Sequence, residues 1–134
     1  MTIYSSSKVE KGGMLQQNSG LILSNRLSFA RACGVTPIIL GRHPRAHKRD
    51  IKWSKIAALI DTLHTFKAVI WIDADAFFVG TGNCSWIDNV SRPFSIARDA
   101  HQPEKFNTGV MLVSQDALRL LSLIWLENDR GKGV

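Results

Sequence analysis

Residues 68 to 75 read Ala68-Val69-Ile70-Trp71-Ile72-Asp73-Ala74-Asp75, an apolar run that ends in two acidic side chains. The apolar part predicts a strand buried on both faces, with Trp71 as a core residue and not a substrate platform. Such a strand delivers its acidic residues to the sheet edge where open α/β folds bind ligands. If the segment stays extended, Asp73 and Asp75 point to the same side, because residues two apart share a face.

The two carboxylates need a positive partner. At ~4 Å and an effective dielectric of ~20 they repel each other by roughly 4 kcal/mol. A divalent cation removes that repulsion, and oxygen ligands favour Mg²⁺, Mn²⁺ or Ca²⁺. Asp-x-Asp is a short pattern, however, and a solvated loop is the alternative interpretation. The metal site predicted at Asp73 and Asp75 therefore depends on what the rest of the chain supplies.

The composition indicates one globular α/β domain spanning residues 1–134. The chain has 134 residues, of which 45% are hydrophobic and 21% are charged, and it is long enough to bury a core. No apolar run approaches the ~20 residues of a membrane span, and the first residues lack the apolar core of a signal peptide. Cys33 and Cys84 are too few for a disulfide framework.

The net charge of +6 indicates a polyanionic partner: nucleic acid, anionic lipid or a nucleotide diphosphate. Much of the excess lies between residues 42 and 55, where only Asp50 opposes the positive charge. A solvated loop is the alternative. Trp53 is the single aromatic residue there, which argues against a nucleic-acid stacking platform. The basic residues of this stretch are Arg42, Arg45, Lys48, Arg49, Lys52 and Lys55.

Helical and strand patterns alternate along the chain, with short connections. This alternation predicts an α/β fold with a mainly parallel sheet and helices on both faces, and Gly34 is placed to end the first helix. We expect strands at 1–5, 35–40, 68–72, 94–97 and 109–113, helices at 21–33, 51–64 and 116–128, and a helical turn at 87–90.

Several short motifs occur in an order that is typical of one superfamily. The chain resembles the GT-A nucleotide-sugar glycosyltransferases and is most similar to the eukaryotic galactosyl-, mannosyl- and xylosyltransferase family of the Golgi. The resemblance runs from about Asn25 to Trp125. The motifs that carry it are Asn25-Arg26-Leu27-Ser28-Phe29-Ala30, Trp53-Ser54-Lys55-Ile56, Asp73-Ala74-Asp75, Ile96-Ala97-Arg98-Asp99 and Asn107-Thr108-Gly109.

The resemblance implies a metal-dependent glycosyltransferase in the Golgi. Such an enzyme moves a hexose or pentose from a nucleotide-diphosphate sugar, such as a UDP-sugar, to a glycan or glycoprotein acceptor. Asn83-Cys84-Ser85 and Asn89-Val90-Ser91 match the N-glycosylation acceptor pattern, which weakly indicates a secretory compartment.

The resemblance also assigns roles to individual residues. Asp73 would lie near the ribose and the metal, and Asp75 would hold Mn²⁺ or Mg²⁺ against the diphosphate. Lys55 would pair with phosphate, and Trp53 would pack beneath the nucleotide. Their alternatives are a surface lysine and a core tryptophan.

Asn107 and Asp99 would shape the sugar and acceptor side of the site, as the catalytic pair. The alternatives are a turn residue for Asn107 and a strand-end cap for Asp99.

Some features depart from the family pattern. Such catalytic domains are usually longer, and the C-terminal part with a further metal-binding histidine is missing, so we expect an incomplete domain. We do not expect His43, His47, His64 or His101 to be metal ligands. A non-catalytic module that binds sugar nucleotides is one alternative function. A haloacid dehalogenase-type phosphatase, with Asp73 as nucleophile, is another.

Overall fold

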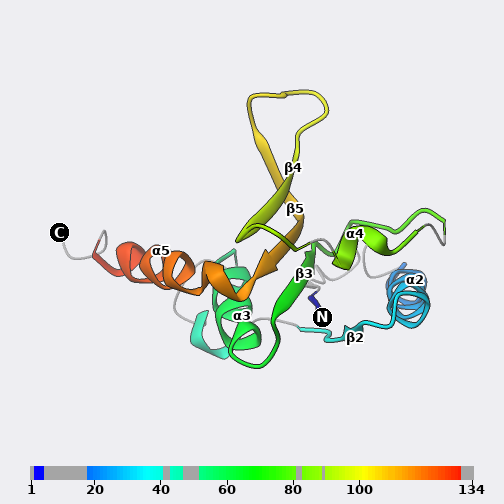
Figure 1. Cartoon of the computed structure of the whole chain (residues 1–134), viewed down its shortest axis with the longest axis horizontal. Coiled ribbons are helices and arrows are strands. Elements are labelled where there is room, and N and C mark those ends of the chain that lie inside the picture. The colour runs from blue at the N-terminus through cyan, green and yellow to red at the C-terminus, as the bar shows by residue number, and fades with distance from the viewer. Residues whose placement is uncertain are drawn as a thin grey trace.

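The computed structural model describes residues 2–4, 18–40, 43–46, 52–80, 83–88 and 90–130, with the backbone alone for 2–4 and 128–130. Helices flank a central sheet (Figure 1). The elements are β1 (Thr2–Tyr4), α2 (Ser19–Ala32), β2 (Thr36–Pro37), a 3-10 turn (Pro44–Ala46), α3 (Trp53–Leu63), β3 (Ala68–Ile72), α4 (Ser85–Asp88), β4 (Phe94–Arg98), β5 (Phe106–Ser114), a second 3-10 turn (Gln115–Ala117) and α5 (Leu118–Arg130).

The sheet is mixed, with the strand order β2-β1-β3-β5-β4. β1 pairs in parallel with β2 and β3, whereas β5 is antiparallel to both β3 and β4. The prediction of a mainly parallel sheet is therefore wrong for its β5–β4 side. The reason lies in the connection: residues 99–105 alone join β4 to β5, and a parallel crossover needs about a dozen residues or more.

Helices cover both faces of the sheet, as predicted. On one face α3 and α5 pack against Val69, Trp71 and the β5 residues that share their side. On the other face α2 and α4 cover Ile70 and Ile72. In Figure 1 the two helix pairs lie on opposite sides of β3. All five residues of β3 are buried, and Trp71 is 0% exposed, which confirms it as a core residue.

Helix α2 ends where the sequence predicts. Gly34 has a φ of 62°, in the left-handed region where glycine carries no Cβ penalty. The following strand is shorter than expected: β2 contains only Thr36 and Pro37. Among the described residues, no helix combines the length and apolar character that crossing a membrane requires.

A disulfide joins Cys33, at the end of α2, to Cys84, just before α4. Two cysteines are too few for a framework, but they form this one cross-link between segments that are far apart in the chain. The pairing was not anticipated from the sequence, because two cysteines in a chain carry no information on whether their Cα atoms come within bonding range.

Candidate active site at the end of β3

Asp73 directly follows β3 and is held from three directions. Its Oδ1 accepts a hydrogen bond from the indole N–H of Trp71 and lies 2.9 Å from Nζ of Lys55. Its backbone N–H donates to the carbonyl of Gly109 at 2.7 Å. The side chain of Asp73 is 34% exposed and that of Lys55 is 17% exposed, so this ion pair lies at the sheet edge and is partly shielded from solvent.

Lys55 links this carboxylate to β5. Its Nζ also donates to the carbonyl of Thr108 at 2.9 Å. The neighbouring Asn107 accepts a hydrogen bond from Gly109 N–H through Oδ1 at 2.8 Å. A Cβ on Gly109 would lie 2.9 Å from Asn107 Oδ1 and 3.6 Å from Asp73 Oδ2. The structure thus brings together three of the predicted motifs, which come from α3, β3 and β5.

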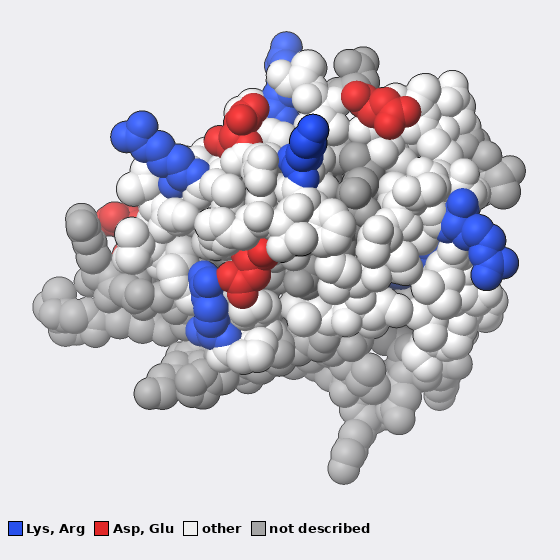
Figure 2. Space-filling view, turned by 60° about the horizontal axis from the view of Figure 1, so that its bottom comes forward, with Lys and Arg blue, Asp and Glu red and all other residues white. Residues whose placement is uncertain are grey.

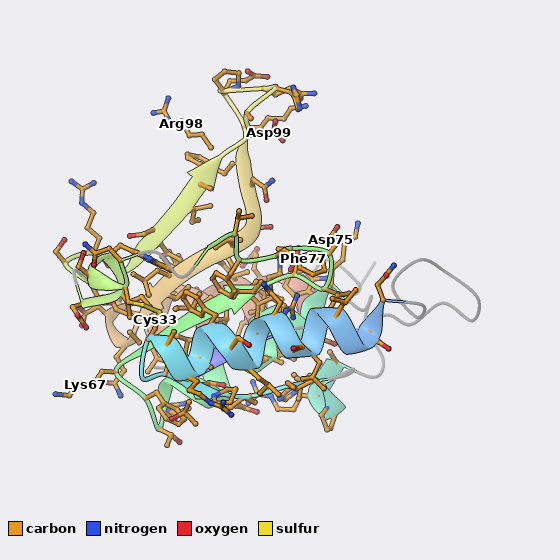
Figure 3. The ribbon with its side chains drawn as sticks, turned by 90° about the vertical axis from the view of Figure 1, so that its right-hand side faces the viewer. Cys33, Lys67, Asp75, Phe77, Arg98 and Asp99 are labelled. Atoms are coloured by element: carbon orange, nitrogen blue, oxygen red, sulfur yellow. A yellow bond between two sulfur atoms is a disulfide. The ribbon has the colours of Figure 1, made fainter. Side chains whose placement is uncertain are left out.

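Asp75 lies in a turn and not on an extended strand. Ala76 N–H donates to the carbonyl of Asp73 at 3.1 Å, which closes a turn over residues 73–76. Asp73 and Asp75 therefore do not share a strand face, and that prediction is wrong. Asp75 is exposed, and Figure 3 shows it on the segment that leaves the sheet toward Phe77.

A buried arginine joins the two acidic residues electrostatically. Arg26, on α2, is 3% exposed and donates to the carbonyl of Asp73 at 2.6 Å. Burial lowers the pKa of the Arg26 guanidinium, while the carboxylates of Asp73 and Asp75 oppose that shift by favouring its charged form. Arg26 thus contacts the acidic segment directly through the backbone carbonyl of Asp73.

Asp73 and Asp75 supply carboxylate oxygens, the ligand type that hard divalent cations prefer. Oδ1 of Asp73 is engaged by Trp71 and Lys55, which leaves Oδ2 for another partner. Within the described part of the chain, no three His, Cys, Asp or Glu side chains gather in a metal-binding group. Two carboxylates suit Mg²⁺-like sites, where substrate phosphates and water complete the coordination.

Two of the predicted site residues, Trp53 and Asp99, make structural contacts of their own. Trp53 packs edge-on against Trp125 of α5, with ring centroids 6.3 Å apart. Asp99 caps the turn beyond β4: its Oδ1 accepts from His101 N–H at 2.8 Å and Gln102 N–H at 3.1 Å. Figure 3 shows Asp99 on the projecting β4–β5 hairpin, away from the turn that carries Asp75. Asp99 therefore matches its structural alternative, a strand-end cap, whereas Trp53 is half-buried and lies outside the buried core.

The described part of the basic stretch is engaged in structural contacts. Arg45 forms an ion pair with Asp61 and lies over the ring of Trp125. Buried His43 contacts the same carboxylate at 2.9 Å. In Figure 2 basic and acidic side chains are interspersed on the face shown. Arg42, His47, Lys48, Arg49 and Asp50 lie outside the described residues, as does Asn89 of the second glycosylation pattern.

Arg26 is the residue that sequence reasoning missed. It was part of the quoted motif, but no role was given to it. A signal was present: Arg26 follows Ile22 by four residues and precedes Phe29 and Ala30 by three and four. At helical spacing this places a charged residue on the inward stripe of α2.

The comparisons with known proteins concern the fold. The chain is similar in structure to a glycosyltransferase involved in the glycosylation of the major capsid of PBCV-1, with a TM-score of 0.67 and 15% sequence identity. The match covers 92% of this chain and 64% of that protein, so the chain spans less than two thirds of its length. No family model and no curated protein matches the chain. The shared feature is thus a glycosyltransferase fold.

Replacing Lys55 with methionine is expected to lower the free energy of unfolding by about 1–3 kcal/mol, because Asp73 and the Thr108 carbonyl both lose a charged donor. Urea unfolding followed by tryptophan fluorescence measures the change. Lys67, whose exposed side chain lies just before β3, is the matched control, and Lys67→Met should shift the value by less than about 0.5 kcal/mol. Equal stability of both variants would make Lys55 a surface lysine without a structural role.

Proposed function

We propose that this protein is a metal-dependent glycosyltransferase that takes a hexose or pentose from a nucleotide-diphosphate sugar. The observation that carries the proposal is the meeting of Asp73, Lys55 and Asn107-Thr108-Gly109 at the end of β3. The shared glycosyltransferase fold supports it, as does the sheet-edge position at which α/β folds bind ligands. The acceptor would be a glycan or a glycoprotein.

Asp75 and Oδ2 of Asp73 would hold Mn²⁺ or Mg²⁺. When bound, the cation stabilises the negative charge that develops on a diphosphate leaving group. Lys55 serves this site by orienting Asp73, because its ammonium already contacts that carboxylate and the Thr108 carbonyl. Its main proposed role is therefore to position Asp73 as a metal ligand. Direct pairing with phosphate is a secondary role.

The side-chain amide of Asn107 is the group that we propose contacts the sugar. Its Oδ1 is used by Gly109 N–H, so the amide nitrogen of this exposed side chain is left to donate to a hydroxyl. Trp53 and Asp99 receive no role in the chemistry here, since Trp53 packs on Trp125 and Asp99 caps a turn.

We place the protein in the lumen of the secretory pathway, in keeping with the Golgi resemblance. Two features support this location. The Cys33–Cys84 disulfide is a bond that persists in oxidising compartments. Asn83, the first residue of one glycosylation pattern, is exposed.

Isothermal titration of UDP with Mn²⁺ and with EDTA tests the proposal. We expect UDP to bind more tightly with Mn²⁺, and Asp75→Ala to weaken the Mn²⁺-dependent binding by about tenfold or more, because a direct ligand is lost. Asp88→Ala, which removes an exposed carboxylate of α4, is the matched control and should leave binding unchanged. Equal UDP affinity in Mn²⁺ and EDTA would contradict the proposal.

Turnover separates an enzyme from a module that only binds sugar nucleotides. The purified chain is incubated with Mn²⁺, a panel of UDP- and GDP-sugars and simple glycoside acceptors, and products are detected by mass spectrometry. Transfer or slow donor hydrolysis supports catalysis. Binding without either product would identify the non-catalytic module. Phosphate release from a monoester, with no response to UDP, would identify the phosphatase.

A further inference from the structure

The side chain of Arg26 contacts the backbone of the acidic turn, residues 73–76. The Nη2 group of Arg26 donates to two carbonyls, those of Asp73 at 2.6 Å and Ala76 at 3.3 Å. These two carbonyls belong to the first and last residues of the turn that the Ala76 N–H to Asp73 hydrogen bond closes. One guanidinium from a distant helix thus bridges both ends of the turn.

The same helix holds the segment that follows. The Asn25 side chain pairs with both backbone groups of Phe78: it donates to the carbonyl at 2.8 Å and accepts from the N–H at 3.0 Å. The Phe78 ring stacks on Phe29, with an interplanar angle of 1°. The acidic turn is therefore docked on α2, with Arg26 at the turn itself and Asn25 two residues beyond it.

Stability alone is a poor explanation for this arginine. Its Nε and Nη1 atoms are buried, and they have no hydrogen-bond partner among the described residues. A buried charge is costly, and an apolar side chain of similar volume is often as good for stability or better. An incompletely satisfied arginine that holds the turn carrying Asp73 and Asp75 points to a role in what those carboxylates do.

We infer that Arg26 is the positioning residue of the cation site: by bridging the Asp73 and Ala76 carbonyls it fixes the turn from which Asp73 and Asp75 present their carboxylates. The inference rests on the proposed function for its consequence, which is cation binding. Its structural part, the bridging of the turn, stands independently of that function.

The charge of Arg26 and its positioning of the turn predict opposite effects of replacing Arg26 on Mn²⁺ affinity. A positive charge near the two carboxylates repels a cation, so if charge were its only contribution, Arg26→Met would bind Mn²⁺ more tightly. If Arg26 positions the turn, the same change weakens binding, by the 10- to 100-fold that is typical when support for metal ligands is lost. Arg26→Lys keeps the charge and loses the planar fork, so any weakening in that variant reports geometry.

The experiment combines two measurements on four variants of the full chain. Amide hydrogen exchange, read by mass spectrometry on peptides covering residues 72–79, reports the turn without any metal. Titration with Mn²⁺ in the presence of UDP reports the site. The controls are Arg31→Met, the same chemical change at an exposed position of α2, and Asn25→Ala, which removes the two hydrogen bonds to Phe78.

We expect faster exchange and at least about tenfold weaker Mn²⁺ binding in Arg26→Met, a smaller loss in Arg26→Lys, and no change in Arg31→Met. Asn25→Ala, which releases only Phe78 beyond the turn, should weaken Mn²⁺ binding less than Arg26→Met does. If Arg26→Met does not fold, Arg26→Lys decides.

Unchanged exchange and unchanged Mn²⁺ affinity in a folded Arg26 variant, or tighter Mn²⁺ binding, would overturn the inference. A wild-type chain that binds no Mn²⁺ with UDP contradicts the proposed function instead, and faster exchange in the Arg26 variants would then still support the bridging role.

Discussion

Replacing Trp71 with alanine is expected to lower the free energy of unfolding by about 3–5 kcal/mol, the range for large core side chains. Trp71 is 0% exposed and lies in the centre of the sheet, where it contacts the cluster that α3 and α5 form with β5. The cavity left behind would be lined by residues of two helices and two strands, which cannot all collapse into it. Urea unfolding monitored by circular dichroism measures the change.

Trp86 is the matched control, because it is also a tryptophan but is 42% exposed. Trp86→Ala should cost less than about 1 kcal/mol. Trp71→Phe separates packing from the indole hydrogen bond to Asp73: it should cost less stability than alanine and still weaken Mn²⁺-dependent UDP binding. Normal stability in Trp71→Ala with weakened ligand binding would show that Trp71 is a ligand platform after all.

The strand before Asp73 could be predicted because its signal is local and strong. Five consecutive apolar residues matched β3 at both ends, and the amphipathic spacing located α3 to within two residues. Both elements form because they bury apolar side chains, and the spacing of apolar residues in the sequence indicates which residues are buried. Strand direction is different, because it depends on the path of the connections. The expected strands at 94–97 and 109–113 left residues 98–108 as the connection, whereas the observed strands extend further and shorten it to 99–105, which makes β5 antiparallel to β4.

The site was predictable as an order of motifs but not as a geometry. Lys55, Asp73 and Asn107-Thr108-Gly109 do meet. The turn at residues 73–76 was missed because it depends on a partner from outside the segment, the Arg26 side chain. Asp99 makes the contacts of a strand-end cap, since two turn amides donate to its carboxylate. Trp53 contacts Trp125 but is half-buried, so it is not the core tryptophan of the alternative interpretation.

Loss of the Cys33–Cys84 disulfide is expected to lower the free energy of unfolding by roughly 4 kcal/mol. The two cysteines are 51 residues apart, and closing a loop of that length removes about this much conformational freedom from the unfolded chain in the entropic description. Urea unfolding of the oxidised and the reduced protein measures the difference. Cys33→Ala/Cys84→Ala is the control: it should resemble the reduced protein and should not respond to reductant.

Reduction of the disulfide should affect ligand binding less than it affects the free energy of unfolding. The disulfide anchors the chain at Cys84, whereas Arg26 and Asn25 hold residues 73–78 directly. We therefore expect reduction to change Mn²⁺-dependent UDP binding by less than about threefold at a temperature where the reduced chain stays folded, because the turn keeps its own contacts with α2. A large loss of binding in the folded, reduced protein would show that the cross-link itself positions Asp73 and Asp75. Equal unfolding curves for the oxidised and reduced protein would instead show that the bond does not constrain the chain.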